Sequence, residues 1–215
     1  MKLQSRFARM VDIYPVTGRE LFQGRLTDRE AIARLAAGGA RIVQLRDKRL
    51  HARDLFKLAL LYREETLTHG MMLIINDRAD IALACKADGV HLGRDDLPIR
   101  EARKMLGPDM LIGGSSHTLE QALEAQAQGA SYVNIGPLFA TATKPGAAGI
   151  GLEPLRQAVE RLKVPVTCMG GVNGGNIAQV RQAGARHVGV VGAIFGAADI
   201  ADATARLARA IRSAG

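Results

Sequence analysis

The sequence predicts an α/β protein, a single (β/α)8 TIM barrel with a parallel eight-stranded core, and three observations lead to this prediction. Eight short apolar runs recur along the chain, and each is followed by a segment with the apolar spacing of a helix. The runs are nearly continuous in apolar residues, which is typical of parallel strands buried on both faces. Eight such units in 215 residues fit one barrel at the small end of the usual size.

The predicted strands and helices alternate from one end of the chain to the other. The expected strands cover residues 12–17, 40–46, 71–76, 88–93, 110–116, 130–136, 164–170 and 187–193. The expected helices cover residues 28–39, 51–70, 77–87, 97–107, 118–129, 152–163, 175–184 and 199–215. Several helical segments end in Gly, a common C-terminal signal, and Thr118 and Gln121 have the spacing of a capping box.

One domain spanning residues 1–215 is the expected organisation, because no linker or low-complexity segment interrupts the pattern. The alternative is an open doubly wound sheet. Its dinucleotide fingerprint, G-x-G-x-x-G, is absent after the first apolar run, where the chain reads "VTGREL". The barrel therefore accounts for the pattern better than the open sheet does.

Composition limits the partners that we expect. The net charge of +8 favours anions, but the chain has no Trp and few other aromatic residues on which bases could stack, so we expect no nucleic acid. No apolar run approaches the roughly 18 residues of a membrane span, so we expect no membrane partner and a cytoplasmic protein. The two cysteines, Cys85 and Cys168, are expected in the core of a reduced protein.

In a barrel of this kind, the functional side chains follow the C-terminal ends of the strands. The second run ends with Gln44, Arg46 and Lys48, which alternation places on one side of the strand. Two cations near a barrel interior indicate a bound anion, because unpaired buried charge is costly. The alternative is that both cations pair with Asp47 or other acids in a surface loop.

The third and fourth runs are followed by carboxylates. Asn76 and Asp77 end the third run, and Asp95 and Asp96 follow the fourth. Neighbouring strands bring such loops together, so Asp77 and Asp96 could share Mg²⁺, which prefers oxygen ligands and keeps several waters. The alternative is that both residues are helix N-caps.

Three later strand ends carry further polar or flexible segments. The fifth run ends with Ser115, Ser116 and His117, where capping or loop hydrogen bonding is the expected role of His117. The sixth is followed by Thr141, Thr143 and Lys144, two hydroxyls and an ammonium that could hold an anion. Glycine-rich segments, "MGGVNGGNI" and "VVGAIFGAADI", follow the seventh and eighth runs, the usual phosphate site of such barrels. The sequence therefore predicts two anion sites at one mouth.

Seven motifs, taken in order, resemble the thiamine-phosphate synthase family over nearly the whole chain. They are "YPVT", "VQLRDK", "INDRAD", "DGVHLGRDDLP", "IGGSSHT", "YVNIGPLFATATKPG" and "GVVGAI". The resemblance implies a transferase that joins hydroxymethylpyrimidine diphosphate to thiazole phosphate and releases pyrophosphate. It implies the barrel, Mg²⁺ and small phosphorylated pyrimidine and thiazole substrates; a homo-oligomer is left open. The related thiazole tautomerase is similar in fold but resembles these diphosphate motifs poorly.

The resemblance also implies a role for each matching residue. Pyrimidine-diphosphate contacts fall on Gln44, Arg46, Lys48, Asn76, Ser115 and Lys144, with Arg46, Lys48, Ser115 and Lys144 in the chemical step. Magnesium ligands fall on Asp77 and Asp96, and thiazole-phosphate contacts fall on Thr141, Thr143, Gly171, Val191 and Gly192. Two positions depart from the family, which commonly has Ser at Gly192 and Asp at Gly18.

Overall fold

Eight parallel strands form one sheet with the order β1-β8-β7-β6-β5-β4-β3-β2 in the computed structural model, which describes residues 2–141 and 148–213. The strands are β1 (Ile13–Pro15), β2 (Ile42–Leu45), β3 (Met72–Asn76), β4 (Gly89–Leu92), β5 (Leu111–Ser116), β6 (Tyr132–Ile135), β7 (Val166–Cys168) and β8 (His187–Val190). An isolated parallel bridge between Val16 and Gln44 joins the two outer strands. The Thr17 N–H also donates to the Gln44 carbonyl at 2.9 Å, so the sheet closes into the predicted barrel.

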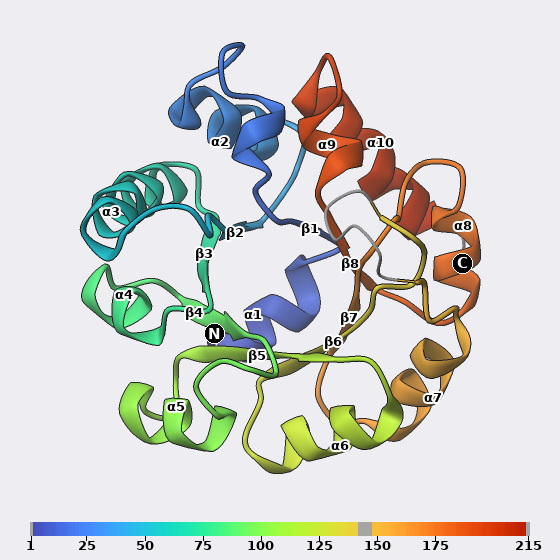
Figure 1. The fold of residues 1–215 in the computed structure, drawn as a ribbon. Helices are drawn as coiled ribbons and strands as arrows, with labels where there is room; N and C mark the ends of the chain where they lie inside the picture. The colour runs from blue at the N-terminus through green and yellow to red at the C-terminus, as the bar shows by residue number, and fades with distance from the viewer. Residues whose placement is uncertain (1, 142–147, 214–215) are drawn as a thin grey trace.

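Helices surround the ring of strands, as the view along the barrel in Figure 1 shows. They are α2 (Asp28–Ala37), α3 (Ala52–Thr68), α4 (Ala79–Ala84), α5 (Ile99–Leu106), α6 (Leu119–Ala127), α7 (Glu153–Arg161), α8 (Ile177–Gln182), α9 (Gly192–Phe195) and α10 (Ile200–Ser213), with a short 3-10 turn η1 (Arg19–Leu21). None of the helices in the described part of the chain combines the length and hydropathy that a membrane crossing requires.

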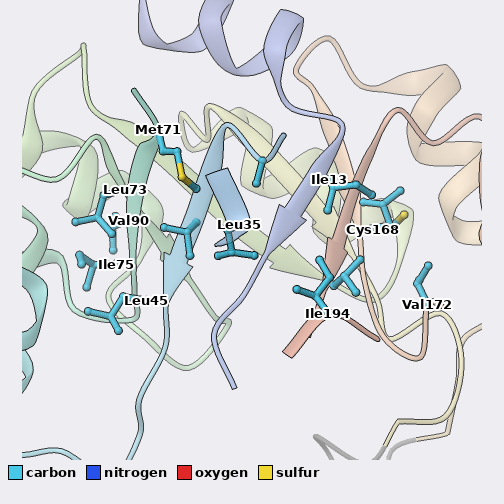
Figure 2. Close-up of a cluster of buried hydrophobic side chains, with 14 of the residues drawn as sticks. Ile13, Leu35, Leu45, Met71, Leu73, Ile75, Val90, Cys168, Val172 and Ile194 are labelled. Carbon is cyan, nitrogen blue, oxygen red and sulfur yellow. The ribbon is translucent and has the colours of Figure 1, made fainter. Parts of the chain in front are cut away.

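Strand side chains alternate between two apolar layers. In β3, Leu73 and Ile75 belong to the large core between strands and helices, whereas Met72 and Ile74 belong to a second cluster inside the barrel. Figure 2 shows Leu73, Ile75 and Val90 close together in the outer core. Both layers are buried, which explains why the strands read as nearly continuous apolar runs.

A further helix, α1 (Leu3–Met10), lies across the opening of the barrel in Figure 1. Its Phe7 is fully buried and stacks on Tyr132 with 4.5 Å between ring centroids. The Arg6 side chain donates to the carbonyl of Gly70, the second residue before β3, and Gln4 donates to the carbonyl of Ser131, the residue before β6. The helix therefore closes the N-terminal end of the barrel, and the contacts of its Phe7 with Tyr14 and Tyr132 form what we call the barrel floor.

Threonine side chains cap the N-termini of α2 and α6. The Thr27 hydroxyl accepts from the Glu30 N–H and the Glu30 carboxylate accepts from the Thr27 N–H, so α2 starts with a full capping box. At α6, Thr118 accepts from the Gln121 N–H as predicted, but the Gln121 side chain accepts from the N–H of His117, one residue earlier.

The structure departs most from the expected elements at two places. Helix α1 is not among the predicted helices: Leu3, Phe7 and Met10 have helical spacing, but the helix is only 8 residues long and Phe7 alone among them is buried. The eighth strand is expected to run to residue 193, but it ends at Val190 and α9 begins at Gly192. This change from strand to helix leaves Val191 as the one residue between them and places Gly192 at the start of α9, at the C-terminal end of the barrel.

Candidate active site

The polar strand ends lie at the end of the barrel opposite α1. The loop after β2 is held by Thr17, whose hydroxyl accepts from the Arg46 N–H at 2.8 Å and donates to the Arg46 carbonyl at 3.0 Å. Thr17 follows β1, so the chain just past the first strand fixes the backbone of the predicted cation loop. These two hydrogen bonds therefore fix the backbone of Arg46 at the rim.

Asp47 anchors the same loop from outside the barrel. Its carboxylate accepts from the Arg19 guanidinium at 2.9 Å and from the N–H groups of Arg49 at 2.9 Å and Leu50 at 3.3 Å. Burial raises the pKa of Asp47, but these hydrogen bonds outweigh it and the pKa lies below its ordinary value. Asp47 pairs with Arg19, so the form of the alternative in which Asp47 neutralises both cations is wrong. Lys48 does pair with another acid, Asp77, as the rest of that alternative allows.

Lys48 turns instead to the carboxylates after β3 and β4. Its ammonium lies 3.2 Å from Asp77 Oδ2. Asp77 has a left-handed backbone with φ of 63°, uncommon outside Gly, which marks a constrained position. Asp96 accepts from the Gly93 N–H at 2.6 Å. Burial, and next a hydrogen bond with Asp77, raise the pKa of Asp96, so the two carboxyls lie together and oppose double ionisation.

The alternative role of these carboxylates as helix caps is wrong. Helix α4 begins at Ala79 with Arg78 at the N-cap, and α5 begins at Ile99 with Pro98 there, each without a side-chain cap bond. Asp77 and Asp96 are therefore available to a cation. Among residues 2–141 and 148–213, no group of three or more His, Cys, Asp or Glu side chains could hold a metal ion. A pair of oxygen ligands with room for water and phosphate fits Mg²⁺.

The glycine loops lie beside the loop that follows β6. Gly170 and Gly171 both have positive φ, 99° and 66°, and a Cβ on Gly171 would lie 2.6 Å from the Ala140 carbonyl. Only glycine permits that approach. The predicted phosphate residue Gly171 is thus adjacent to the segment that leads into Thr141.

The last two predicted phosphate residues lie just past β8. Val191 precedes α9, and its side chain is so close to Gly18 that a Cβ there would lie 2.9 Å from Val191 Cγ1. An aspartate at position 18 would require Val191 to move, which gives a physical reason for the Gly in this chain. Gly192 faces open space, since no atom lies within 4 Å of a Cβ built on it. Thr143 and Lys144, which the sequence predicts across the mouth, lie outside the described residues.

A second group of predicted residues lies deeper in the barrel. Gln44 is 1% exposed and Ser115 is half-buried, and Asn76 ends β3 opposite His91 in the register of β3 and β4. Ser115 Oγ is 2.9 Å from Nε2 of His91, a residue that the sequence pattern does not single out. His91 lies within an apolar run on β4, and its hydrogen bonds identify it as part of the site. Side chains alternate along β4, so His91, two residues past Gly89, points to the same side of the strand as Gly89, the inside of the barrel. That alternation was the sequence signal that could have identified His91.

The two cysteines and His117 have the structural roles expected of them. Cys85 and Cys168 are buried, as expected, and burial raises the pKa of both thiols, that of Cys168 to about 12. Both therefore stay protonated. His117 Nδ1 makes a hydrogen bond with the Gly136 carbonyl, which is the loop role expected for it.

Comparison with known proteins identifies the family. The family model described as thiamine monophosphate synthase matches residues 13–194. The thiamine-phosphate synthase of Moorella thermoacetica is 45% identical over 94% of this chain and 97% of its own length. That of Chloroflexus aurantiacus is 44% identical over 96% and 95%.

A solved structure agrees with the sequence comparison. The thiamine phosphate pyrophosphorylase of Pyrococcus furiosus superimposes with a TM-score of 0.86 at 35% identity, covering 95% of this chain and 97% of that one. The matches extend over the barrel and include every strand that contributes to the site. The chain belongs to the thiamine monophosphate synthase family and is a transferase.

Proposed function

We propose that the protein joins hydroxymethylpyrimidine diphosphate to thiazole phosphate, giving thiamine monophosphate and pyrophosphate. The observation that carries this proposal is the contact of Lys48 with Asp77, beside Asp96, at the same rim as Arg46. Cations next to a carboxylate pair suit a diphosphate that arrives with a divalent ion. The names of the relatives support the same reaction class.

The bonding changes need little from the protein except charge and position. The carbon–oxygen bond to the diphosphate breaks, and its electron pair leaves on the diphosphate oxygen. Arg46, Lys48 and Lys144 stabilise that developing charge more than they stabilise the ground state. The thiazole nitrogen then forms the new carbon–nitrogen bond with its own lone pair. A positioned second substrate explains why the site needs no protein nucleophile.

The proposed metal is Mg²⁺ held by Asp77 and Asp96. When bound, the ion supplies positive charge to the diphosphate oxygens. Burial, and next the hydrogen bond with Asp77, raises the pKa of Asp96, and a divalent cation beside the two carboxylates would favour the ionised form of both. The thiazole phosphate is assigned to the other side of the mouth, to Thr141, Thr143, Gly171, Val191 and Gly192. Glycine N–H groups can approach a phosphate closely there.

The first test is activity with both substrates. Purified protein with Mg²⁺ is expected to release pyrophosphate only when the pyrimidine diphosphate and the thiazole phosphate are both present. A thiazole tautomerase would change the thiazole without pyrophosphate release. A phosphate-sensing or nucleic-acid-binding protein would release none. Folded protein that binds both substrates and forms no pyrophosphate would exclude the synthase.

The second test addresses the metal. The substitution Asp77→Asn is expected to lower kcat/KM by about 100-fold or more and to raise the Mg²⁺ concentration needed for half-maximal rate. Asp80→Asn is the matched control, because Asp80 is nearby but its carboxylate pairs with Arg78 at 2.6 Å on the surface. An Asp77→Asn enzyme with the parent's Mg²⁺ dependence would show that the metal assignment is wrong.

A further inference from the structure

A chain of hydrogen-bonded side chains crosses the barrel interior between two predicted pyrimidine contacts. Gln44 Nε2 donates to the Tyr14 hydroxyl at 2.9 Å, and the hydroxyls of Tyr14 and Tyr132 are 2.8 Å apart. The Tyr132 hydroxyl is 3.1 Å from His91 Nδ1, and His91 Nε2 is 2.9 Å from Ser115 Oγ. We call these five residues the polar relay. It connects β2, β1, β6, β4 and β5 in a single line.

The strands are built to accommodate this line. His91, Gly113 and Tyr132 lie side by side in the sheet register, on β4, β5 and β6. A Cβ on Gly113 would collide with the Tyr132 hydroxyl and would lie 2.5 Å from His91 Nδ1. The glycine therefore leaves the space through which Tyr132 reaches across β5 to His91. Below, the stacked ring of Phe7 holds Tyr132 in place.

The middle of the relay is dry. Tyr14 and Tyr132 are fully buried and His91 is 3% exposed. Burial raises the pKa of both tyrosines well above the ordinary value, so each hydroxyl keeps its single proton. Water does not compete for these protons, and each bond is correspondingly strong and costly to break.

One direction gives every proton of the relay an acceptor. Gln44 Nε2 donates to the Tyr14 oxygen, so the Tyr14 proton needs a different acceptor, and the Tyr132 oxygen 2.8 Å away supplies one. The Tyr132 proton then has His91 Nδ1 as its acceptor at 3.1 Å, and in this arrangement the imidazole proton is on Nε2. His91 Nε2 then donates to Ser115 Oγ. The serine hydroxyl, already an acceptor from His91, has its own proton to donate to a ligand.

We propose that the polar relay selects an aminopyrimidine over an oxopyrimidine. Its two ends offer a ligand one acceptor, the Gln44 amide oxygen, and one donor, the Ser115 hydroxyl. A 4-aminopyrimidine offers the matching pair, an amino donor and a ring-nitrogen acceptor. A 4-oxopyrimidine offers an acceptor where the amino group was and a protonated ring nitrogen. Tyr14, Tyr132 and His91 are thus positioning residues, and this role rests on the proposed function.

The substitution Tyr132→Phe breaks the relay at its centre. Tyr14 is then able to donate back to the Gln44 amide after the amide turns over, and His91 can adopt the other tautomer. Gln44 and Ser115 then no longer have a fixed donor or acceptor role toward the ligand, although neither side chain is removed. A site that hydrogen-bonds its substrate rejects a mismatched analogue by leaving polar groups unpaired, so this freedom should reduce rejection.

The experiment compares kcat/KM for the 4-amino pyrimidine diphosphate and its 4-hydroxy analogue. Tyr132→Phe is expected to lower the ratio of the two values by about tenfold, with the KM for thiazole phosphate unchanged. Phe7→Leu is the control, because it disturbs the packing of the same ring without changing any proton, and its ratio should equal the parent's. A parent-like ratio in Tyr132→Phe overturns the inference, whereas absence of turnover in the parent overturns the proposed function.

A direct reading of the proton position needs no substitution in the enzyme under study. Nitrogen chemical shifts of ¹⁵N-histidine in the parent are expected to show His91 with the proton on Nε2 and none on Nδ1; a His91→Gln sample assigns the signal among the five histidines. The opposite tautomer would reverse the relay and refute the proposal. This measurement also decides the question if Tyr132→Phe does not fold.

Discussion

Replacing Asp47 with asparagine tests whether the cation loop depends on an anchor outside the barrel. The Asp47 side chain is 4% exposed, and Arg19, its partner at 2.9 Å, is 14% exposed. Arg19 is held in turn by two hydrogen bonds to Asp28, at 3.0 and 2.9 Å, and Tyr62 donates to Asp28 at 2.7 Å. The loop that contains Arg46 and Lys48 is thus fixed to α2 and α3.

The size of the effect follows from what the amide side chain retains. In Asp47→Asn, the amide oxygen would still accept from the N–H groups of Arg49 and Leu50, but the charged bond to Arg19 would be lost. A hydrogen bond to a charged group contributes about 1.5–3 kcal/mol, so Asp47→Asn should lower the free energy of unfolding by that amount at pH 7. The pKa of Asp47 lies below its ordinary value, so its contribution is present above the unfolded pKa and is lost as pH falls through the folded pKa. Parent and variant should therefore converge in acid.

The assay combines urea unfolding at pH 7 and in acid with inhibition by pyrophosphate. We expect the inhibition constant for pyrophosphate to rise in Asp47→Asn, because the loop bearing Arg46 and Lys48 loses its anchor. Asp88→Asn is the matched control: Asp88 pairs with Arg63 at 2.7 Å, with exposed fractions of 15% and 13%, and accepts from the Leu73 N–H at the other end of the barrel. Equal weakening of pyrophosphate inhibition in both variants, or parent-like stability of Asp47→Asn at pH 7, would refute the reasoning.

Three further outcomes are expected. Phe7→Ala should lower the free energy of unfolding by about 3–5 kcal/mol in urea titration, because removal of a fully buried ring leaves a cavity in the barrel floor. A loss below about 1 kcal/mol would mean that α1 is not part of the folded core. Burial lowers the pKa of His187 below its ordinary 6.5, so the parent should lose stability as pH falls below 6.5 while His187→Asn does not. Parallel pH profiles of the two proteins in thermal unfolding would contradict this assignment. Gly192→Ser should lower the KM for thiazole phosphate about two- to tenfold, because the space is open and a neutral hydrogen bond contributes about 0.5–1.5 kcal/mol; a raised KM would place the phosphate elsewhere.

The repeating part of the fold was predictable from sequence because it depends on local composition. Each strand buried on both faces must be apolar throughout, and all eight runs contain the observed strands. Boundaries were harder where backbone geometry changes abruptly. Val191 continues the apolar run of β8, yet the chain turns there into α9, because an apolar residue does not distinguish a strand from a short buried helix.

The rim residues were predictable because the ends of parallel strands gather at one edge. Lys48, Asp77 and Asp96 meet as that rule requires, whereas Thr143 and Lys144 stay predictions because the structure does not describe them. The links between distant residues were not predictable. His91 reads as one more residue of an apolar strand, and its place between Tyr132 and Ser115 depends on the register of three strands. Arg19 reaches Asp47 across 28 positions of sequence, which no local pattern encodes.

The position of α1 closes one end of the barrel. Phe7 and the two tyrosines that it contacts are fully buried, so solvent does not reach the barrel interior from the α1 end. Under the proposed reaction, a pyrimidine carbon that has lost its diphosphate must meet the thiazole nitrogen before it meets water. Closure at the α1 end leaves the opposite rim as the route for both molecules, so the order of entry at the rim would decide between thiamine monophosphate and a hydrolysed alcohol.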